Sequence, residues 1–327
     1  FRVIGLENNK RKLFFGKSAD ISQNIFELKK NKKFTFIKSD INNSYTIKKI
    51  YQTKKIILTI HAAAQPSHDW SATNPILDYK VNALGTLSLL ENLRKLRPDS
   101  QFIFLSTNKV YGDYVNSLNY LEKKNRYEVE NKYKNGFDEN INIDNSLHSP
   151  FGASKLSADI LTQEYGKYFG LKTCSLRAGC LTGENHSGVE LHGFLSYLFK
   201  CSYYKKKYKI FGYKGKQVRD NLSAKDVASI VWQLFKKKPI PGEVFNIGGG
   251  RESNVSILEA INKCEKITKN NFKFRYINKA RKGDHKFWIT NMKKFKSRYK
   301  NWKIKLNIDD VLNEMNSYEN YKNKKKL

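Results

Sequence analysis

Unbroken apolar runs alternate with longer amphipathic stretches along most of the chain. Such runs lack the alternation of a half-exposed strand and are typical of strands buried on both faces. The stretches between them are long enough for helices, and the longest is expected to run from Ser71 to Arg97, ending before Pro98. The strands are expected at 2–6, 34–37, 56–60, 102–105, 172–176 and 244–247. This order predicts an α/β fold, a doubly wound parallel sheet with helices on both faces.

The same pattern predicts two lobes. We expect residues 1–178 to form a nucleotide-binding domain, to which 217–250 returns. Residues 179–216 and 251–327 are expected to form a smaller α/β substrate-binding lobe. The polar, Asn-rich stretch 114–147 has no clear period, and a connection of that length inside a compact domain is usually functional or mobile.

Composition narrows the class of protein. With 327 residues, 39% of them hydrophobic, the chain can bury a large core. No apolar run is long enough to cross a bilayer and the N-terminus does not read as a signal peptide, so we expect no membrane partner. The four cysteines lack metal-ligand spacing and the six histidines are scattered, which predicts no metal site. Reduced thiols in a chain of this size favour a cytoplasmic protein.

The formal net charge of +31 would ordinarily suggest a nucleic-acid partner. The lysines, however, are spread through nearly every surface segment, and the one dense group, near 322–326, is short. A single binding face is therefore not indicated, and we expect no nucleic-acid partner. The excess positive charge would still attract a substrate that carries a diphosphate. An RNA-binding relative of the same fold stays open as an alternative and would need its lysines gathered on one face.

Two strand ends carry candidate nucleotide contacts. Glu7 and Asn8 follow the first expected strand, where a carboxylate in a doubly wound sheet can bond both ribose hydroxyls of NAD and repel the extra phosphate of NADP. By itself, a strand-end Glu is usually a polar turn residue. After the third expected strand, Ala62, Ala63 and Ala64 would let the backbone approach a pyrophosphate or ribose closely, although tight helix–strand packing explains them equally well.

Two further segments carry candidate chemistry. Ser-Thr-Asn-Lys-Val-Tyr-Gly-Asp at 106–113 closes an apolar run, and Ser-Pro-Phe-Gly-Ala-Ser-Lys at 149–155 opens a helix. Ser149 suits the N-cap and Pro150 the first helical turn, which puts Phe151 and Lys155 on one helix face. A Lys at this spacing is otherwise an ordinary solvated residue. Together the two segments resemble the catalytic Thr/Ser and Tyr-x-x-x-Lys of the extended short-chain dehydrogenase/reductase family.

That resemblance implies a Rossmann domain that binds NAD. It makes Thr107 the catalytic hydroxyl that bonds a sugar oxygen, and Lys155 the residue that holds the nicotinamide ribose. Asn82, within Asn-x-x-Gly-Thr, commonly holds the central strand and approaches the nicotinamide. The implied cofactor-binding set is Glu7, Asn8, Asp40, Ile41, Ala62, Ala63, Ala64, Asn82 and Lys155, in which Asp40 and Ile41 resemble the family's adenine-contacting pair.

The chain also resembles one group within this family, the CDP-paratose 2-epimerases. The resemblance rests on 106–113, the long insert after it, Gly-Lys-Gln-Val-Arg-Asp at 215–220 and Phe-Asn-Ile-Gly-Gly at 245–249. It implies a nucleotide-diphosphate sugar as substrate and epimerisation through a transient keto-sugar. Arg219 and Arg281 would clamp the diphosphate, since a planar guanidinium meets phosphate oxygens bidentately; either could instead be a surface ion-pair residue. Asn108 and Cys180 are weaker substrate contacts. Homodimers are common in the family.

The chain departs from the family pattern at Phe151, where the family carries its acid/base Tyr. A phenyl ring has no proton to give or take, and loss of a general base typically costs about 10²–10⁴ in rate. Tyr111, Thr107 or Lys155 could substitute, Tyr111 being the only other nearby phenol that the motifs suggest. Two alternatives stay open: a dehydratase or other chemistry on a nucleotide sugar, and a non-catalytic protein that binds NAD or nucleotide sugar.

The second departure concerns the N-terminus. The family opens with a strand and a Gly-x-x-Gly-x-x-Gly turn that cradles the pyrophosphate, whereas this chain begins at Phe1 with what looks like the second strand. The first strand of this topology lies in mid-sheet, so its absence would leave two interior edges unpaired. We therefore expect the sequence to lack an N-terminal segment and to bind NAD poorly as it stands.

Overall fold

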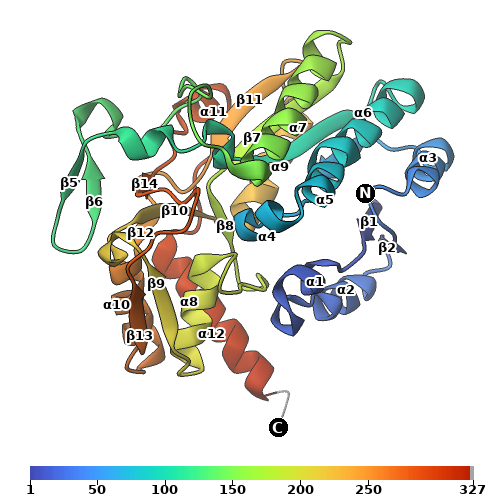
Figure 1. The fold of residues 1–327 in the computed structure, drawn as a ribbon. Helices are drawn as coiled ribbons and strands as arrows, with labels where there is room; N and C mark the ends of the chain where they lie inside the picture. Colours follow the sequence, from blue (N-terminus) through green and yellow to red (C-terminus); the bar gives the residue numbers. More distant parts are fainter. Residues whose placement is uncertain (325–327) are drawn as a thin grey trace. The chain divides into compact units, whose positions relative to one another are not determined.

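The computed structural model describes residues 1–324, and the chain folds into two compact units (Figure 1). Unit 1 comprises Phe1–Ser106, Ser149–Leu176 and Phe235–Val244, and unit 2 comprises Thr107–His148, Arg177–Leu234 and Phe245–Leu327. This division assigns 107–148 and most of 217–250 to the second unit, whereas the predicted domain boundaries assign both segments to the first. The domain boundaries stay a prediction.

Two strand pairs of unit 1, β1–β2 and β3–β4, are parallel, as their unbroken apolar runs predict. The β1–β2 pair is in register from Val3 with Phe34, and β3–β4 from Leu58 with Gln101. A four-stranded sheet has the order β11-β7-β4-β3, and β1-β2 forms a separate two-stranded sheet. The strands are β1 (Val3–Glu7), β2 (Phe34–Lys38), β3 (Leu58–His61), β4 (Gln101–Thr107), β7 (Lys172–Ala178) and β11 (Glu243–Ile247), of which the last three continue into unit 2.

The helices of unit 1 differ from the prediction in one place. The prediction of a single helix from Ser71 to Arg97 is wrong. This stretch contains α4, α5, a π-helical turn (Lys80–Leu84) and α6. The break falls at Asn74 (φ −134°, ψ 62°), because the ring of Pro75 disfavours helical geometry in the residue before it. The helices are α1 (Arg11–Phe15), α2 (Ser22–Lys29), α3 (Ser44–Thr53), α4 (His68–Thr73), α5 (Pro75–Tyr79), α6 (Gly85–Leu96) and α7 (Ser149–Lys167).

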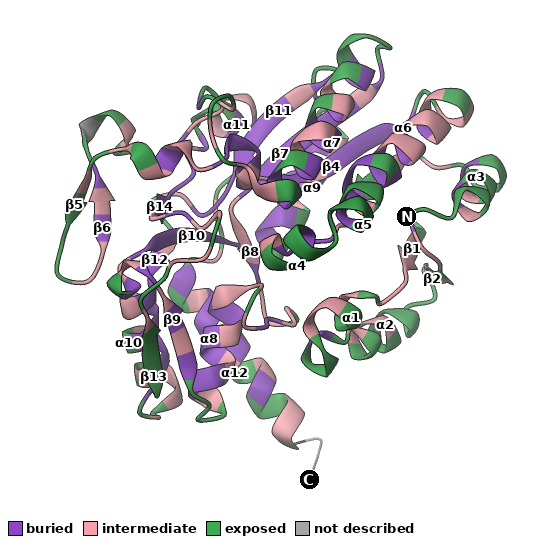
Figure 2. Cartoon of the chain, viewed as in Figure 1, coloured by how far each residue is buried: buried purple, intermediate pink, exposed green. Residues whose placement is uncertain are grey.

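The core of unit 1 lies between α6, α7 and the sheet. Leu90, Leu93, Phe102 and Phe104 are completely buried there, and Figure 2 shows β4 and β7 covered along most of their length. His61, at the end of β3, is buried in the same layer and hydrogen-bonds Thr86 Oγ1 through Nε2 at 2.8 Å. Burial, reinforced by the charge of Lys155, lowers the pKa of His61 to about 3, so this imidazole is neutral near pH 7.

Unit 2 packs three helices, α8, α10 and α12, around a separate apolar core. A four-stranded sheet runs beside them, in which β10 pairs in parallel with β8 and β14 and antiparallel with β12. The long polar insert carries the β5–β6 hairpin. The elements of this unit are β5 (Tyr120–Glu122), β6 (Tyr127–Val129), β8 (Cys180–Thr182), α8 (Phe194–Tyr203), β9 (Tyr208–Phe211), β10 (Val218–Ser223), α9 (Ala224–Lys236, which ends in unit 1), β12 (Asn254–Ser256), α10 (Ile257–Thr268), β13 (Phe274–Ile277), β14 (Phe287–Trp288), α11 (Lys293–Arg298) and α12 (Ile308–Lys324).

Neither a membrane-spanning helix nor a three-residue metal cluster occurs among the described residues. Within residues 1–324, no helix has both the length and the apolar character that a membrane span needs. The same residues contain no group of three His, Cys, Asp or Glu side chains placed to hold a metal ion. Cys174, Cys180, Cys201 and Cys264 form no disulfide bonds. The cytoplasmic location stays a prediction.

Candidate active site

The N-terminus of α7 is the best-defined part of the site in unit 1. The helix begins at Ser149, whose Oγ accepts a hydrogen bond from Gly152 N at 3.3 Å, so this residue caps the helix as predicted. Its φ of +61° lies in the left-handed region, which a non-glycine residue enters only when its surroundings hold it there. Phe151, two residues on, is buried.

Lys155 follows one turn later and is also buried. Its Nζ donates to Leu105 O at 2.8 Å and lies 4.0 Å from the centroid of the Phe104 ring. Burial lowers the pKa of the Lys155 ammonium to about 7, against the opposing effect of Asp159 and Asp78. An ammonium has three donors, and Leu105 O takes one of them. The donors that remain suit ribose hydroxyls, so this residue fits the NAD contact predicted for it.

A buried polar network joins α7 to the segment after β3. Asn82 Nδ2 donates to Ser154 Oγ at 2.9 Å, and Asn82 Oδ1 accepts from Gln65 N at 2.9 Å. Asp78 accepts from Ser154 Oγ at 2.5 Å and from Gln65 Nε2 at 2.6 Å. Asn82 thus ties the loop after β3 to α7, consistent with its predicted role in holding the central strand. Its approach to the nicotinamide stays a prediction.

The remaining candidate cofactor residues lie at the carboxyl ends of strands in unit 1, the edge at which doubly wound sheets bind nucleotides. Glu7 ends β1 and accepts backbone hydrogen bonds from Asn8 and Asn9 at 2.8 and 2.7 Å. Asp40, two residues beyond β2, accepts from Asn8 Nδ2 at 2.9 Å and pairs with Lys10 at 2.7 Å. The structure therefore joins the predicted residues Asn8 and Asp40. The others are Ile41, which is buried, and Ala62, Ala63 and Ala64, which follow β3.

In unit 2, a 3₁₀ turn (Asn108–Tyr111) directly follows β4 and contains much of the predicted chemistry. Thr107 precedes the turn. Its Oγ1 accepts from Lys109 N at 3.2 Å, which caps the turn, and donates to Asn108 Oδ1 at 3.4 Å. Asn108 is buried beside it. Convergence of Thr107 and Tyr111 with Lys155 of unit 1 stays a prediction.

Tyr111 is completely buried at the end of that turn. Its Oη donates to Asn246 Oδ1 at 2.7 Å and accepts from Arg177 Nη1 at 3.0 Å, and its ring stacks on Trp288 with centroids 5.7 Å apart. Burial raises the pKa of the phenol to about 12. These contacts favour a structural role and weigh against Tyr111 as the replacement base, which stays a prediction open to direct test.

Tyr111→Phe is expected to lower the free energy of unfolding by about 1–2 kcal/mol, because Asn246 Oδ1 loses its donor inside the core. Turnover by the folded variant should stay within a few-fold of the parent protein. Chemical denaturation and steady-state kinetics test the two parts separately. A loss of turnover beyond 100-fold at unchanged stability would instead identify Tyr111 as the base.

A cluster of charged side chains surrounds the predicted diphosphate residues. Arg219 of β10 pairs with Asp284 at 2.5 Å and also donates to His285 O. Arg281 donates to Leu191 O at 3.1 Å. Burial raises the pKa of the Cys180 thiol to about 11, so Cys180 of β8 is protonated near pH 7.

Lys109 belongs to the same cluster, although sequence reasoning did not single it out. Its Nζ donates to Gly283 O at 2.7 Å. Burial lowers the pKa of this ammonium to about 7, Asp284 opposes that shift, and Arg219 adds to it. Asp284 was missed as well, since an Asp 65 residues from its Arg partner leaves no local signal. The structure thus joins Arg219 to a carboxylate and a second cation.

His68 is a third residue that sequence reasoning missed. It is the first residue of α4, is half-buried, and its Nδ1 lies 2.7 Å from Ser149 Oγ. Its ring centroid is 4.9 Å from that of Phe151, with the two planes at 70°. None of the predicted motifs includes His68, because nothing in Gln-Pro-Ser-His at 65–68 indicates a partner 81 residues away.

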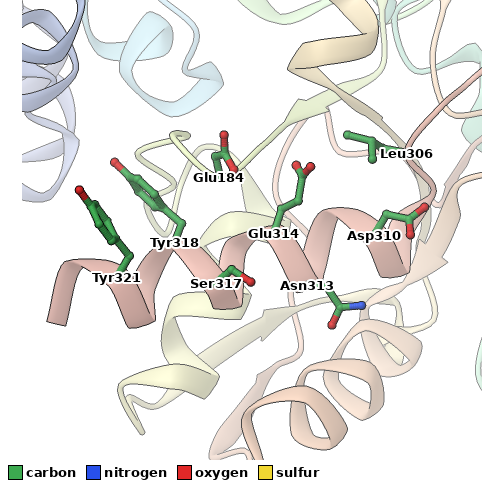
Figure 3. Close-up of a pocket in the computed structure, with 8 residues that line it drawn as sticks. All are labelled: Glu184, Leu306, Asp310, Asn313, Glu314, Ser317, Tyr318 and Tyr321. Carbon is green, nitrogen blue, oxygen red and sulfur yellow. The ribbon is translucent and has the colours of Figure 1, made fainter. Parts of the chain in front are cut away.

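An open pocket of about 540 Å³ lies along α12 in unit 2 (Figure 3). None of the predicted site residues lines it. Two of its three acidic residues, Glu184 and Glu314, pair with Lys225, at 3.4 and 2.9 Å. The lining is Glu184, Leu306, Asp310, Asn313, Glu314, Ser317, Tyr318 and Tyr321.

Residues 2–248 match the sequence pattern of the NAD dependent epimerase/dehydratase family, and the chain belongs to that family. It is 32% identical over 289 residues to the CDP-paratose 2-epimerase of Salmonella typhi, covering 86% of this chain and 83% of that protein. It is 28% identical over 287 residues to the UDP-glucuronate 4-epimerase of Thermodesulfobacterium geofontis, covering 88% and 79%.

Solved structures give the same answer for the fold. The UDP-glucuronic acid 4-epimerase of Bacillus cereus, in complex with UDP-glucuronic acid and NAD, superposes with a TM-score of 0.79 at 26% identity, covering 98% of this chain and 91% of that one. A Tyr-to-Phe mutant of the same enzyme, in complex with UDP-4-deoxy-4-fluoro-glucuronic acid and NAD, gives 0.78 at 26% identity and the same coverage. The predicted family, Rossmann-type fold and NAD cofactor are thereby confirmed.

Proposed function

We propose that this protein is an NAD-dependent epimerase of a nucleotide-activated sugar, with a CDP-activated dideoxy sugar of the paratose type as its substrate. The observation that carries the proposal is the buried Lys155 amine, one helical turn from Phe151 in a chain that shares family motifs on both sides of it. The identity to a CDP-paratose 2-epimerase supports the choice of sugar nucleotide. A cation cluster that includes Arg219 and Lys109 supports a diphosphate-bearing ligand.

In this proposal each unit supplies different contacts. Glu7, Asp40 and Lys155 of unit 1 hold the cofactor, which when bound accepts hydride from one sugar carbon and returns it to the opposite face. Thr107 of unit 2 donates a hydrogen bond to the reacting sugar oxygen. Arg219 and Arg281 hold the substrate diphosphate as bidentate donors, while Asn108 and Cys180 contact the substrate beside them.

Two other functions stay open. A nucleotide-sugar dehydratase fits the family equally well, since the relatives include the dTDP-glucose 4,6-dehydratase of Escherichia coli at 28% identity. A protein that binds NAD and nucleotide sugar without turnover fits the loss of the Tyr hydroxyl at Phe151. The mutant relative crystallised with NAD and a nucleotide sugar shows that a Tyr-to-Phe change in that enzyme is compatible with binding both ligands.

The test incubates full-length protein with NAD and CDP-paratose in deuterated water and follows the sugar by NMR. Inversion at the sugar C2 without deuterium at that carbon is the expected result, because the hydrogen returns as hydride and never exchanges with solvent. Inversion with deuterium incorporation would contradict the hydride route. The same experiment is repeated with UDP-glucuronic acid as a second substrate. If the protein binds these sugar nucleotides but inverts neither of them, the result would favour a binding protein without turnover. CDP-paratose has no oxygen at C6, so dTDP-glucose is supplied as a further substrate, and loss of its C6 oxygen would identify a dehydratase.

A further inference from the structure

A carboxylate that sequence reasoning did not single out lies in the buried network next to Lys155. Asp78 of α5 is completely buried, and α5 packs against α7 in unit 1. Asp78 Oδ2 accepts from Ser154 Oγ at 2.5 Å, and Ser154 directly precedes Lys155 in α7. Asp78 Oδ1 accepts from Gln65 Nε2 at 2.6 Å and from Asn82 Nδ2 at 3.2 Å. Donors from three segments of unit 1 thus fix this carboxyl group and favour its ionised form.

The charge of Lys155 depends on the carboxylates around it. Burial lowers the pKa of its ammonium to about 7, and Asp159 and Asp78 oppose that shift. Asp159 lies one turn further along α7 and accepts from Ser106 Oγ at 2.5 Å. His61, at the end of β3, is neutral near pH 7 and adds no negative charge. Asp78 therefore brings a second negative charge to this buried ammonium, from a different helix.

We propose that Asp78 is a positioning residue of the cofactor site, whose carboxylate anchors the second turn of α7 through Ser154 and favours the ammonium form of Lys155. The inference rests on the proposed function, in which Lys155 holds the nicotinamide ribose of NAD. Since Asp78 is completely buried, it acts through Lys155 and not by touching a ligand. An ammonium suits that task better than a neutral amine, because hydrogen bonds from a charged donor are shorter and stronger.

Two variants separate the charge of Asp78 from its hydrogen bonds. Asp78→Asn removes the charge and can keep the network: the new amide donates to Ser154 Oγ, whose own proton then turns to Phe151 O, 3.0 Å away. Ser154→Ala keeps the charge and removes the hydrogen bond between α5 and α7. Glu164→Gln removes one carboxylate from an exposed position of α7 and is the matched control.

The direct test follows the ¹³Cε resonance of Lys155 against pH in the full-length protein without NAD, identified by its absence from Lys155→Met. We expect a midpoint near pH 7 in the parent and a midpoint about 0.5–1 unit lower in Asp78→Asn, because a nearby opposite charge favours the charged form. Lys109 of unit 2, with a pKa also of about 7, is an internal control that should not move. An unchanged Lys155 midpoint in Asp78→Asn would overturn the proposal.

Calorimetric titration with NAD is the second readout. The affinity of the parent should fall as the pH rises through 7, since Lys155 then loses its charge. Asp78→Asn should bind NAD nearly as well as the parent at pH 5.5 and about 3–10-fold more weakly at pH 8, as its lower midpoint requires. Ser154→Ala should weaken binding by a similar factor at both pH values, because a lost anchor does not titrate. Glu164→Gln should match the parent throughout.

The outcomes distinguish this inference from the proposed function. An equal loss of NAD affinity at pH 5.5 and pH 8 in Asp78→Asn would reveal a purely structural residue and overturn the proposal. A parent whose NAD affinity is the same at both pH values would overturn it too, without any variant. A shifted Lys155 midpoint and pH-dependent NAD binding in a protein that converts no nucleotide sugar would support the role of Asp78 and contradict the proposed epimerase function.

Discussion

Replacing Lys155 by Met is expected to remove turnover and, at the same time, to raise the free energy of unfolding. The activity falls because the site loses the cation proposed to hold the nicotinamide ribose, and we expect a loss of at least about 100-fold. The free energy of unfolding rises because the parent protein must bury an ammonium group, which destabilises its folded state, and the variant does not. A pKa of about 7, against 10.5 for an ordinary Lys, corresponds to about 3 kcal/mol at pH 8. Loss of the hydrogen bond to Leu105 O offsets about 1 kcal/mol of that gain.

The pH dependence of this effect has a definite sign. The pKa of Lys155 is lowered in the folded state, so between pH 7 and 10.5 the unfolded chain binds more protons than the folded one. The contribution of Lys155 to stability therefore rises with pH across that window, and its cost is largest at and below pH 7. The advantage of Lys155→Met should shrink steadily towards pH 10.5.

Urea denaturation of the parent and the variant at pH 7, 8.5 and 10 measures this trend, with NAD titration to follow binding. Lys167→Met, on an exposed turn of the same helix, is the matched control and should change neither stability nor turnover appreciably. A variant less stable than the parent at pH 7 would mean that the Lys155 amine is compensated within the fold and has no need of a ligand.

Prediction from sequence succeeded where the signal was local. Strand positions and the start of α7 follow from apolar runs and from a Ser-Pro pair, and the structure has them where they were expected, with shifts of a residue or two. The family assignment follows from two short motifs and is confirmed. The division of the expected long helix was missed, although Pro75 is visible in the sequence, because a proline also suits the first turn of a helix that continues.

The parts of the site that could not be predicted depend on contacts between distant segments. Lys109 meets the carbonyl of Gly283 across 174 residues, and His68 meets Ser149 across 81. A contact between residues so far apart in the sequence produces no periodic pattern from which it could be predicted. Burial is equally invisible: Lys155 reads as a solvated helix residue until the structure shows it beneath Phe104.

The pair of Arg219 and Asp284 leads to the second large prediction. Arg219→Met is expected to lower the free energy of unfolding by about 2–4 kcal/mol, because it leaves the Asp284 carboxylate without its partner in a mostly buried position. Burial alone would raise the pKa of Asp284, but Arg219 and Lys109 hold it below its usual value. The pair thus stabilises the fold at pH values above the ordinary pKa of Asp. That contribution is lost as the pH falls through the lowered pKa of Asp284.

Combining Arg219→Met with Asp284→Asn separates the fold from the ligand site. The double variant should recover part of the lost stability, since neither member of the Arg219–Asp284 pair is left as an unpaired charge, while Lys109 loses the carboxylate that favours its charged form. Its affinity for CDP, measured by calorimetry, should stay about 10–100-fold below that of the parent, because the bidentate phosphate donor is still absent. Arg251→Met breaks the more exposed pair with Glu128 and serves as the control, with an expected cost within about 1 kcal/mol and unchanged CDP affinity. Recovery of affinity together with stability would show that Arg219 serves the fold alone and that the diphosphate binds elsewhere.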